Sequence, residues 1–196
     1  MEWKLCLEQQ LEPVLAAADS RVGLSTSTDL PFGIFLYPPE DEWELREAIS
    51  HLTVRLENLG KTVQRISMAK LLEEALAMAN FGVEEMAEAE EFSGIELVQA
   101  DIQGILGGKV KGSRPLDDLV AEKIDNSRDH TRHIVLLERV GALFGLHRPS
   151  ALLENLHRKV LHPLVLFYPG QRDGPAGLRF MDAAEADHNY RPKLFS

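Results

Sequence analysis

Four short apolar runs alternate with helix-length segments, and this alternation constrains the fold more than any other feature of the chain. The runs are "FGIFLY" (residues 32–37), "KTVQRIS" (61–67), "HIVLLERV" (133–140) and "PLVLFY" (163–168). The first run is almost continuously apolar, as in a strand that is covered on both faces of a parallel sheet. The order of strands and helices predicts an α/β fold, with a mostly parallel sheet of about four core strands and helices on both faces.

The segments between these runs carry helical patterns. Asp41 and Glu44 have the spacing of a capping box, and apolar residues recur on one helical face from there to Gly60. We also expect helices at residues 1–18 and 68–80. Residues 83–128 read as an acidic helical insertion (83–92, 95–106, 116–126), and residues 163–196 as a strand followed by an edge hairpin of 178–181 and 189–195. A chain of 196 residues is expected to form one domain, 1–196.

The net charge of −10 is unevenly distributed. Residues 1–100 hold 7 basic and 19 acidic side chains, whereas residues 101–196 hold 14 basic and 12 acidic ones. Because affinity for DNA depends mostly on phosphate neutralisation by Lys and Arg, this distribution argues against an autonomous, non-specific DNA-binding protein. The N-terminus lacks the pattern of a signal peptide, and the single cysteine, Cys6, cannot form an internal disulfide. These features predict a soluble, cytoplasmic protein.

Two glycine-containing stretches invite comparison with phosphate loops. Gly170, Gly174 and Gly177 follow the fourth apolar run, but an alternating strand pattern comes next where a phosphate loop requires a helix, so we expect a connection between strands. Gly60-Lys61-Thr62 matches the end of a Walker A motif. However, Arg55 occupies the first glycine position, and the order is helix to strand, which favours a helix C-cap.

The carboxyl ends of the strands form the best candidate small-molecule site by topology, because ligands of α/β sheets gather there. The residues expected at this edge are Tyr37, Ser67, Glu138, Arg139 and Tyr168. The alternative interpretation is an ion-pair network at the strand ends. We favour this alternative, since no phosphate loop accompanies these residues.

Other chemical motifs are incomplete. His130 and His133 have H-x-x-H spacing, but zinc needs three or four convergent ligands, so surface or strand-end histidines are favoured. Ser150 lacks the G-x-S-x-G context of a nucleophile elbow. The run "VEEMAEAEEF" (83–92) has the pattern of a solvated helix face, for which partner binding through an acidic surface is the one functional interpretation kept. We predict no catalytic residue, no metal ligand and no cofactor.

Several stretches resemble the BrxB family of bacterial BREX phage-exclusion systems. They are "LPFGIFLYPPEDEWELREAISHL" (30–52), "VLLERVGALFGLHRPSALLENLH" (135–157), "PLVLFYPG" (163–170), "GPAGLRFM" (174–181) and "NYRPKL" (189–194). The resemblance implies a cytoplasmic antiviral defence protein. Such a protein works beside a PglZ-type alkaline-phosphatase-like protein, a PglX-type methyltransferase and a BrxC-type ATPase. The resemblance carries over no catalytic residue.

The family pattern "FYPG" followed by "G-x-x-G-L-R-F" indicates that residues 168–180 form either a structural corner or a docking surface. Arginines and a lysine would give this hairpin a basic edge, and exposed tyrosines would anchor a partner. The candidate partner-binding residues are Tyr168, Arg172, Arg179, Tyr190 and Arg191, with Lys193 on the same edge.

Three functions follow from these observations, in order of preference. The first is a non-enzymatic assembly or adaptor subunit of a BREX complex, with the PglZ-like protein as the favoured partner. The second is a degenerate nucleotide- or ligand-binding domain with its site at the strand carboxyl ends. The third is DNA contact through the basic C-terminal edge.

Overall fold

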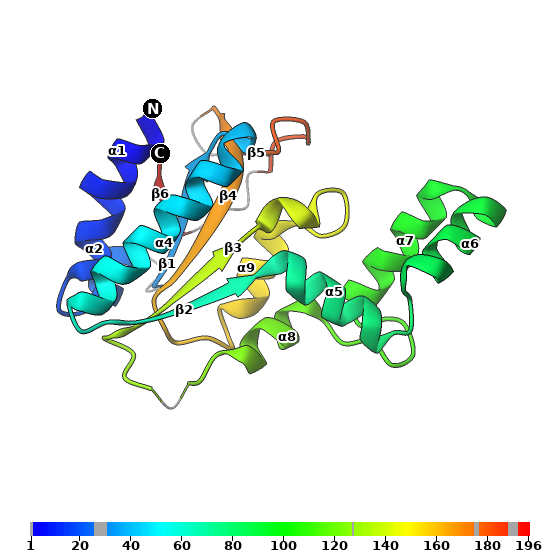
Figure 1. Ribbon diagram of the computed structural model, residues 1–196, viewed down its shortest axis with the longest axis horizontal. Helices are drawn as coiled ribbons and strands as arrows, with labels where there is room; N and C mark the ends of the chain where they lie inside the picture. Colours follow the sequence, from blue (N-terminus) through cyan, green and yellow to red (C-terminus); the bar gives the residue numbers. More distant parts are fainter. Residues whose placement is uncertain (1, 26–30, 127, 175–176, 188–191) are drawn as a thin grey trace.

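The fold is α/β and is built on a six-stranded sheet. The computed structural model describes residues 2–25, 31–126, 128–174, 177–187 and 192–196. Within these residues, five parallel strands lie in the order β2-β3-β4-β1-β6, and β5 pairs antiparallel with the end of β4 (Figure 1). The strands are β1 (Phe32–Tyr37), β2 (Thr62–Ser67), β3 (His133–Glu138), β4 (Leu164–Asp173), β5 (Gly177–Phe180) and β6 (Lys193–Phe195). The predicted fold class is confirmed.

Helices follow most of the predicted segments. The helix predicted at residues 1–18 is a continuous run of three elements that ends at Ala16, and the helix predicted at 95–106 has those bounds. The helices are α1 (Glu2–Cys6), the π-helical η1 (Leu7–Leu11), α2 (Glu12–Ala16), α3 (Ser20–Leu24), α4 (Glu42–Asn58), α5 (Met68–Met78), α6 (Val83–Ser93), α7 (Ile95–Leu106), α8 (Leu116–Lys123) and α9 (Pro149–Leu156), with 3-10 turns η2 (Pro39–Asp41) and η3 (Val140–Leu143).

The two faces of the sheet are covered by helices from different parts of the chain. The N-terminal helices α1 to α4 cover one face, where Phe35, Leu136 and Phe167 are fully buried. Helices α5, α7, α8 and α9 cover the other face, where Ile34 and Leu137 are fully buried. Because alternate residues of a strand point to opposite faces, continuous apolar runs fill both layers.

The start of α4 differs from the predicted capping box. Asp41 makes no side-chain capping hydrogen bond, and the turn η2 leads into the helix. Instead, Oδ2 of Asp41 accepts a hydrogen bond of 2.7 Å from Nε1 of Trp3, and Nζ of Lys4 lies 2.5 Å from Oε2 of Glu44. Contacts with the N-terminal helix therefore replace the local cap.

The C-terminal strands pair differently from the predicted edge hairpin. Strand β5 pairs with the end of β4, whereas β6 lies parallel to β1 at the edge of the sheet. Gly170 allows the close approach of β4 and β5, because its φ is 146° and a Cβ there would lie 2.1 Å from the carbonyl oxygen of Arg179. The glycine-rich stretch thus connects two strands, as predicted.

Helices α6 and α7 project from the rest of the molecule (Figure 1, right). Helix α6 contains no buried residue, while the C-terminal half of α7 buries Ile102, Ile105 and Leu106. We call residues 83–106 the α6–α7 arm. The arm is attached to the core through α7 and leaves α6 largely in solvent.

Candidate functional site

At the carboxyl edge of the sheet, Glu138 is held by an ion pair. Nη2 of Arg65 lies 2.6 Å from Oε2 of Glu138, and Nη1 of the same arginine donates to Oγ of Ser50 at 2.9 Å. The side chain of Glu138 is 13% exposed. These contacts join β2 and β3 to α4. They also pair the carboxylate of Glu138 with Arg65, so it is not free to bind a ligand.

The other predicted strand-end residues also face neighbours within the chain. Tyr37 is buried and its hydroxyl donates to Oε2 of Glu42; burial, and then this bond, raise the pKa of Tyr37 far above its ordinary value. Ser67 caps α5, since its Oγ accepts from the backbone N–H of Lys70. Arg139 follows β3 with a left-handed φ of 57°. The four residues share one edge, and the polar groups of Tyr37, Ser67 and Glu138 are each turned to a separate partner within the chain.

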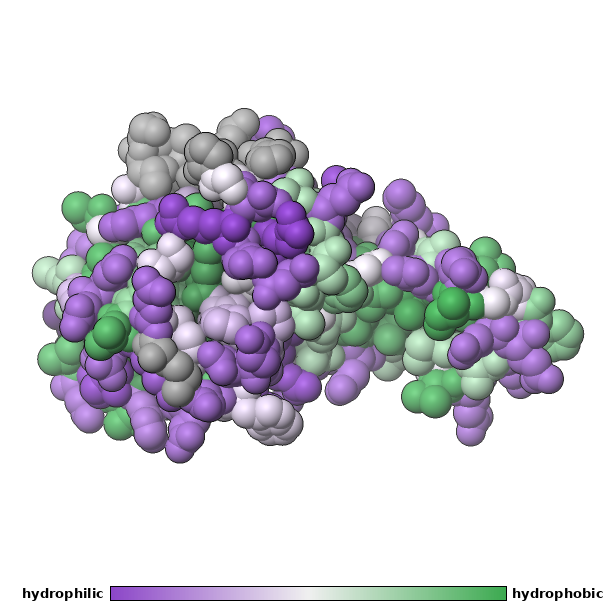
Figure 2. Space-filling model, turned by 90° about the horizontal axis from the view of Figure 1, so that it is seen from above, coloured by the Kyte–Doolittle hydropathy of each residue, from purple (hydrophilic) through white to green (hydrophobic). Residues whose placement is uncertain are grey.

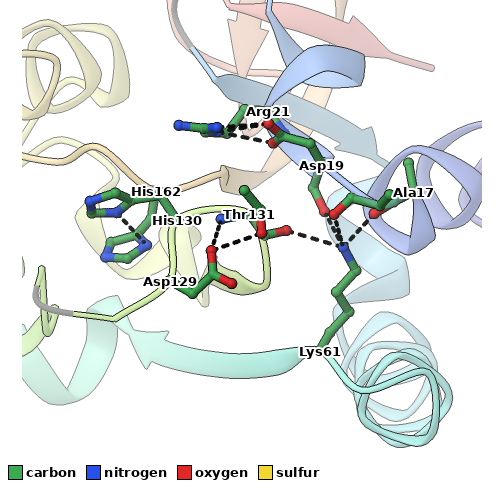
Figure 3. Close-up of polar contacts among 10 residues, drawn as sticks. Ala17, Asp19, Arg21, Lys61, Asp129, His130, Thr131 and His162 are labelled. Carbon is green, nitrogen blue, oxygen red and sulfur yellow. Dashed lines mark hydrogen bonds and ion pairs between the residues drawn. The ribbon is translucent and has the colours of Figure 1, made fainter.

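A denser polar cluster, centred on Lys61, lies at the opposite, amino edge of the sheet (Figure 3). Lys61 is 8% exposed; its Nζ donates to the carbonyl oxygens of Ala17 and Thr131 and to Oγ of Ser20, the last two at 3.1 Å. Burial lowers the pKa of Lys61. Lys61 therefore ties the turn between α2 and α3 to the loop before β3.

The Walker A interpretation of residues 60–62 is excluded by this geometry. Gly60 has a φ of 79°, and the N–H of Lys61 donates to the carbonyl oxygen of Leu56 at 3.1 Å. These are features of a helix C-terminal cap. The predicted C-cap is confirmed, and the lysine side chain serves the fold.

Three histidines are stacked beside this cluster. The ring centroids of His130 and His162 are 4.4 Å apart, as are those of His133 and His162. His133 is 2% exposed, and its Nδ1 has no hydrogen-bond partner among the residues that the structure describes; burial, and then the charge of His162, lower the pKa of His133 to about 4. In the described part of the chain, no group of three or more His, Cys, Asp or Glu residues is placed to hold a metal ion. His133 and His162 are buried, so these two rings form part of the core.

Sequence reasoning missed this amino-edge cluster. Lys61 directly precedes β2, His133 begins β3 and His162 lies just before β4. Polar residues that immediately precede parallel strands meet at one edge of the sheet. Their position before successive strands is the sequence signal that could have predicted the amino-edge cluster.

Strands β4 and β5 form an antiparallel hairpin, which we call the C-terminal hairpin, and one residue predicted to be exposed on it is buried. Tyr168, expected as an exposed anchor, is 0% exposed, and its ring packs 5.2 Å from that of Phe180. The reason is that β4 lies between β3 and β1 inside the sheet. Tyr190 and Arg191 lie outside the described residues.

The predicted basic edge is divided between two sides of the hairpin. Arg172 is paired with Leu178 and Arg179 with Gln171, so the two exposed arginines point to opposite sides of the ribbon. Nη2 of Arg179 lies 2.6 Å from Oδ2 of Asp173, and Nζ of Lys193 donates to the carbonyl oxygen of Gly23 at 2.9 Å. Among the described residues, Arg172, Arg179 and Lys193 therefore do not form one phosphate-binding surface.

A groove of about 890 Å³ lies beside the hairpin. Its walls come from the loop before α9, the end of α7 and the hairpin, and its polar lining includes Lys109, His147, Arg148, Glu185 and Asp187. Ser150 lies in the first turn of α9 and donates to Oδ2 of Asp187. Aromatic contact area in the groove comes from Phe144, which is 42% exposed.

The comparisons with known proteins agree on one family. A family model described as "BREX protein BrxB" matches residues 64–194. The chain belongs to the BrxB family. A curated BrxB relative, "BREX protein BrxB" of Bacillus cereus (strain H3081.97), is 28% identical over 186 residues, which are 93% of this chain and 92% of the relative. No solved structure matches the chain significantly.

Membership of the BrxB family supports a role in BREX phage exclusion, and the resemblance seen in the sequence is confirmed. The BrxB match begins in β2 and ends in β6, so it includes the α6–α7 arm, the histidine stack and the hairpin. In the described part of the chain, none of the helices is long and apolar enough to cross a bilayer.

Proposed function

We propose that this chain is a non-enzymatic assembly or adaptor subunit of a cytoplasmic BREX complex and that it binds the PglZ-like protein. The observation that carries this proposal is the pairing of polar groups within the chain at the carboxyl edge of the sheet. Glu138 is paired with Arg65, and Tyr37 with Glu42, where an α/β enzyme would hold its ligand. A chain of this kind within a defence system of several proteins acts by binding the surfaces of its partners. The PglX-like methyltransferase and the BrxC-like ATPase are the further candidates.

The C-terminal hairpin is the first proposed contact surface. Arg172 and Arg179 are exposed on it, and the buried Tyr168 supports it through Phe180. Tyr190 and Arg191, which follow in the sequence, complete the proposed contact set. Arginine and tyrosine are residue types enriched at the energetic centres of protein interfaces.

Size-exclusion chromatography with light scattering tests the proposal. The full chain is mixed in turn with the purified PglZ-like, PglX-like and BrxC-like proteins of its operon. We expect a co-eluting complex of defined mass with the PglZ-like protein, weakened by Arg172→Glu with Arg179→Glu. Arg158→Glu, which changes another exposed arginine, is the matched control. Separate peaks with all three proteins would contradict the adaptor function.

A ligand-binding role is the second candidate, and the groove beside the hairpin favours it. Lys109 and Arg148 supply positive charge there, and Phe144 supplies an aromatic face. Thermal unfolding in the presence of a nucleotide panel tests this role, since a ligand that binds the folded state raises the Tm. An unchanged Tm at millimolar concentrations of every nucleotide would count against it.

A further inference from the structure

The α6–α7 arm leaves large apolar side chains in water. Phe92 is 88% exposed, Ile95 56% and Leu97 48%. They flank the turn at Gly94, whose φ of 81° lets α6 end and α7 begin at one residue. Figure 2 shows hydrophobic and hydrophilic residues interleaved on the projecting arm. Three large apolar side chains exposed within six residues at one turn are more than the singly scattered exposed apolar residues that need no explanation.

The same region concentrates the negative charge of the protein. The α6–α7 arm, residues 83–106, contains seven Asp and Glu residues and no Lys, Arg or His, so it carries −7 of the net charge of −10. Glu85, Glu88 and Phe92 have the spacing of one helical face, which joins the charge to the apolar surface. Within the described residues, no carboxylate of the arm forms an ion pair.

The charge decides which occupant fits this surface. A second copy of the arm would bring two acidic faces together, and nucleic acid or an anionic membrane would be repelled in the same way. A basic protein surface would be attracted, and apolar side chains on it would cover Phe92, Ile95 and Leu97.

We propose that the α6–α7 arm docks a segment of a partner protein that combines apolar side chains with Lys and Arg, in the form of a basic amphipathic helix. This inference rests on the proposed function, because it names a second surface through which the adaptor holds a BREX protein. The apolar contact supplies most of the affinity, and the carboxylates speed and orient the encounter, so binding weakens as salt increases.

A synthetic probe tests the chemistry of the arm directly. The probe is a fluorescent 20-residue amphipathic helix with Leu on one face and Lys and Arg on the other, and a scrambled peptide of the same composition serves as reference. We expect the full-length protein to bind the probe at least tenfold more tightly than the scrambled peptide in fluorescence anisotropy. Phe92→Ser with Ile95→Ser should remove that preference. Equal binding of both peptides, or unchanged binding by this variant, would overturn the inference.

A matched control separates the arm from exposed apolar surface in general. Trp43 on α4 is 76% exposed, so Trp43→Ser removes a large exposed side chain elsewhere and should leave probe binding unchanged. Both variants should keep the thermal unfolding midpoint of the unmodified protein, because the altered side chains lie in solvent.

The BREX proteins distinguish this inference from the proposed function. If the unmodified chain binds none of them, the adaptor function fails, while the peptide result decides the arm independently. If a BREX partner binds the arm variant as tightly as the unmodified chain, the arm inference fails and the adaptor function stands. A dimer of the unmodified chain that the arm variant loses would identify a second copy as the occupant and also overturn the inference.

Discussion

The sheet core and the α6–α7 arm treat apolar side chains in opposite ways. In the core, Phe35 and Phe167 are 0% exposed, whereas on the arm Phe92 is 88% exposed and α6 buries no residue. Strands β1, β3 and β4 are covered by helices on both faces, while α6 packs mainly against α7. An apolar residue of this protein is therefore buried only where a second layer of the same chain packs against it. On the arm, we propose that a partner protein supplies this second layer.

The largest expected loss of stability comes from a substitution in the core. Phe167→Ala removes a ring that lies 5.5 Å from the ring of Phe35, and the cavity should lower the free energy of unfolding by about 3–5 kcal/mol. Urea denaturation followed by circular dichroism measures this change. A loss below about 1 kcal/mol would mean that the layers over the sheet are not closely packed.

A nearly equal effect is expected at the hairpin. Gly170→Ala places a methyl group 2.1 Å from the carbonyl oxygen of Arg179, so β4 and β5 must separate, at a cost on the order of 3 kcal/mol. Gly174→Ala is the control, because Gly174 also has a positive φ, of 66°, but no atom of the described residues beyond its chain neighbours lies within 4 Å of its Cβ position. The control should cost about 1 kcal/mol. Equal losses in the two variants would show that steric contact does not determine the glycine at residue 170.

A smaller effect is expected from the protonation of His133. Its pKa is about 4 in the folded protein and is near 6.5 in the unfolded chain, so the unfolded state binds more protons between these values. The free energy of unfolding should therefore fall by about 1–3 kcal/mol as the pH decreases from 6.5 to 4. Urea denaturation at several pH values measures the slope. His133→Gln should flatten it, and an equal slope in that variant would assign the effect to other groups.

The smallest expected change in stability comes from a substitution on the arm. Phe92→Ala should change the free energy of unfolding by less than about 0.5 kcal/mol, because the side chain is already in water. The same denaturation measurement, made beside Phe167→Ala, gives the contrast between two phenylalanines in one protein. A loss of more than about 2 kcal/mol would place Phe92 in a buried contact.

Several features could be predicted from local patterns because local physics produces them. The apolar run of β1 and the helical spacing of α7 give their elements directly, and Gly60 ends α4 as its position indicates. The loss of the predicted cap at Asp41 could not be seen in the local pattern, since Trp3 binds the same carboxylate from a distant part of the chain. The end of the apolar run predicts an exposed Tyr168, but β4 continues beyond it, and Tyr168 pairs with Leu36 of β1 inside the sheet.

The α/β alternation, the acidic character of residues 83–106 and membership of the BrxB family can be read from composition, periodicity and motif order, which are properties of the chain. Only the tertiary structure decided which side chains meet. It brought Lys61 to Thr131, His133 to His162 and Arg65 to Glu138, and it left Phe92 without a cover within the described residues. These contacts join residues that are far apart along the chain, and they arise from the order of the strands in the sheet, which no local pattern encodes.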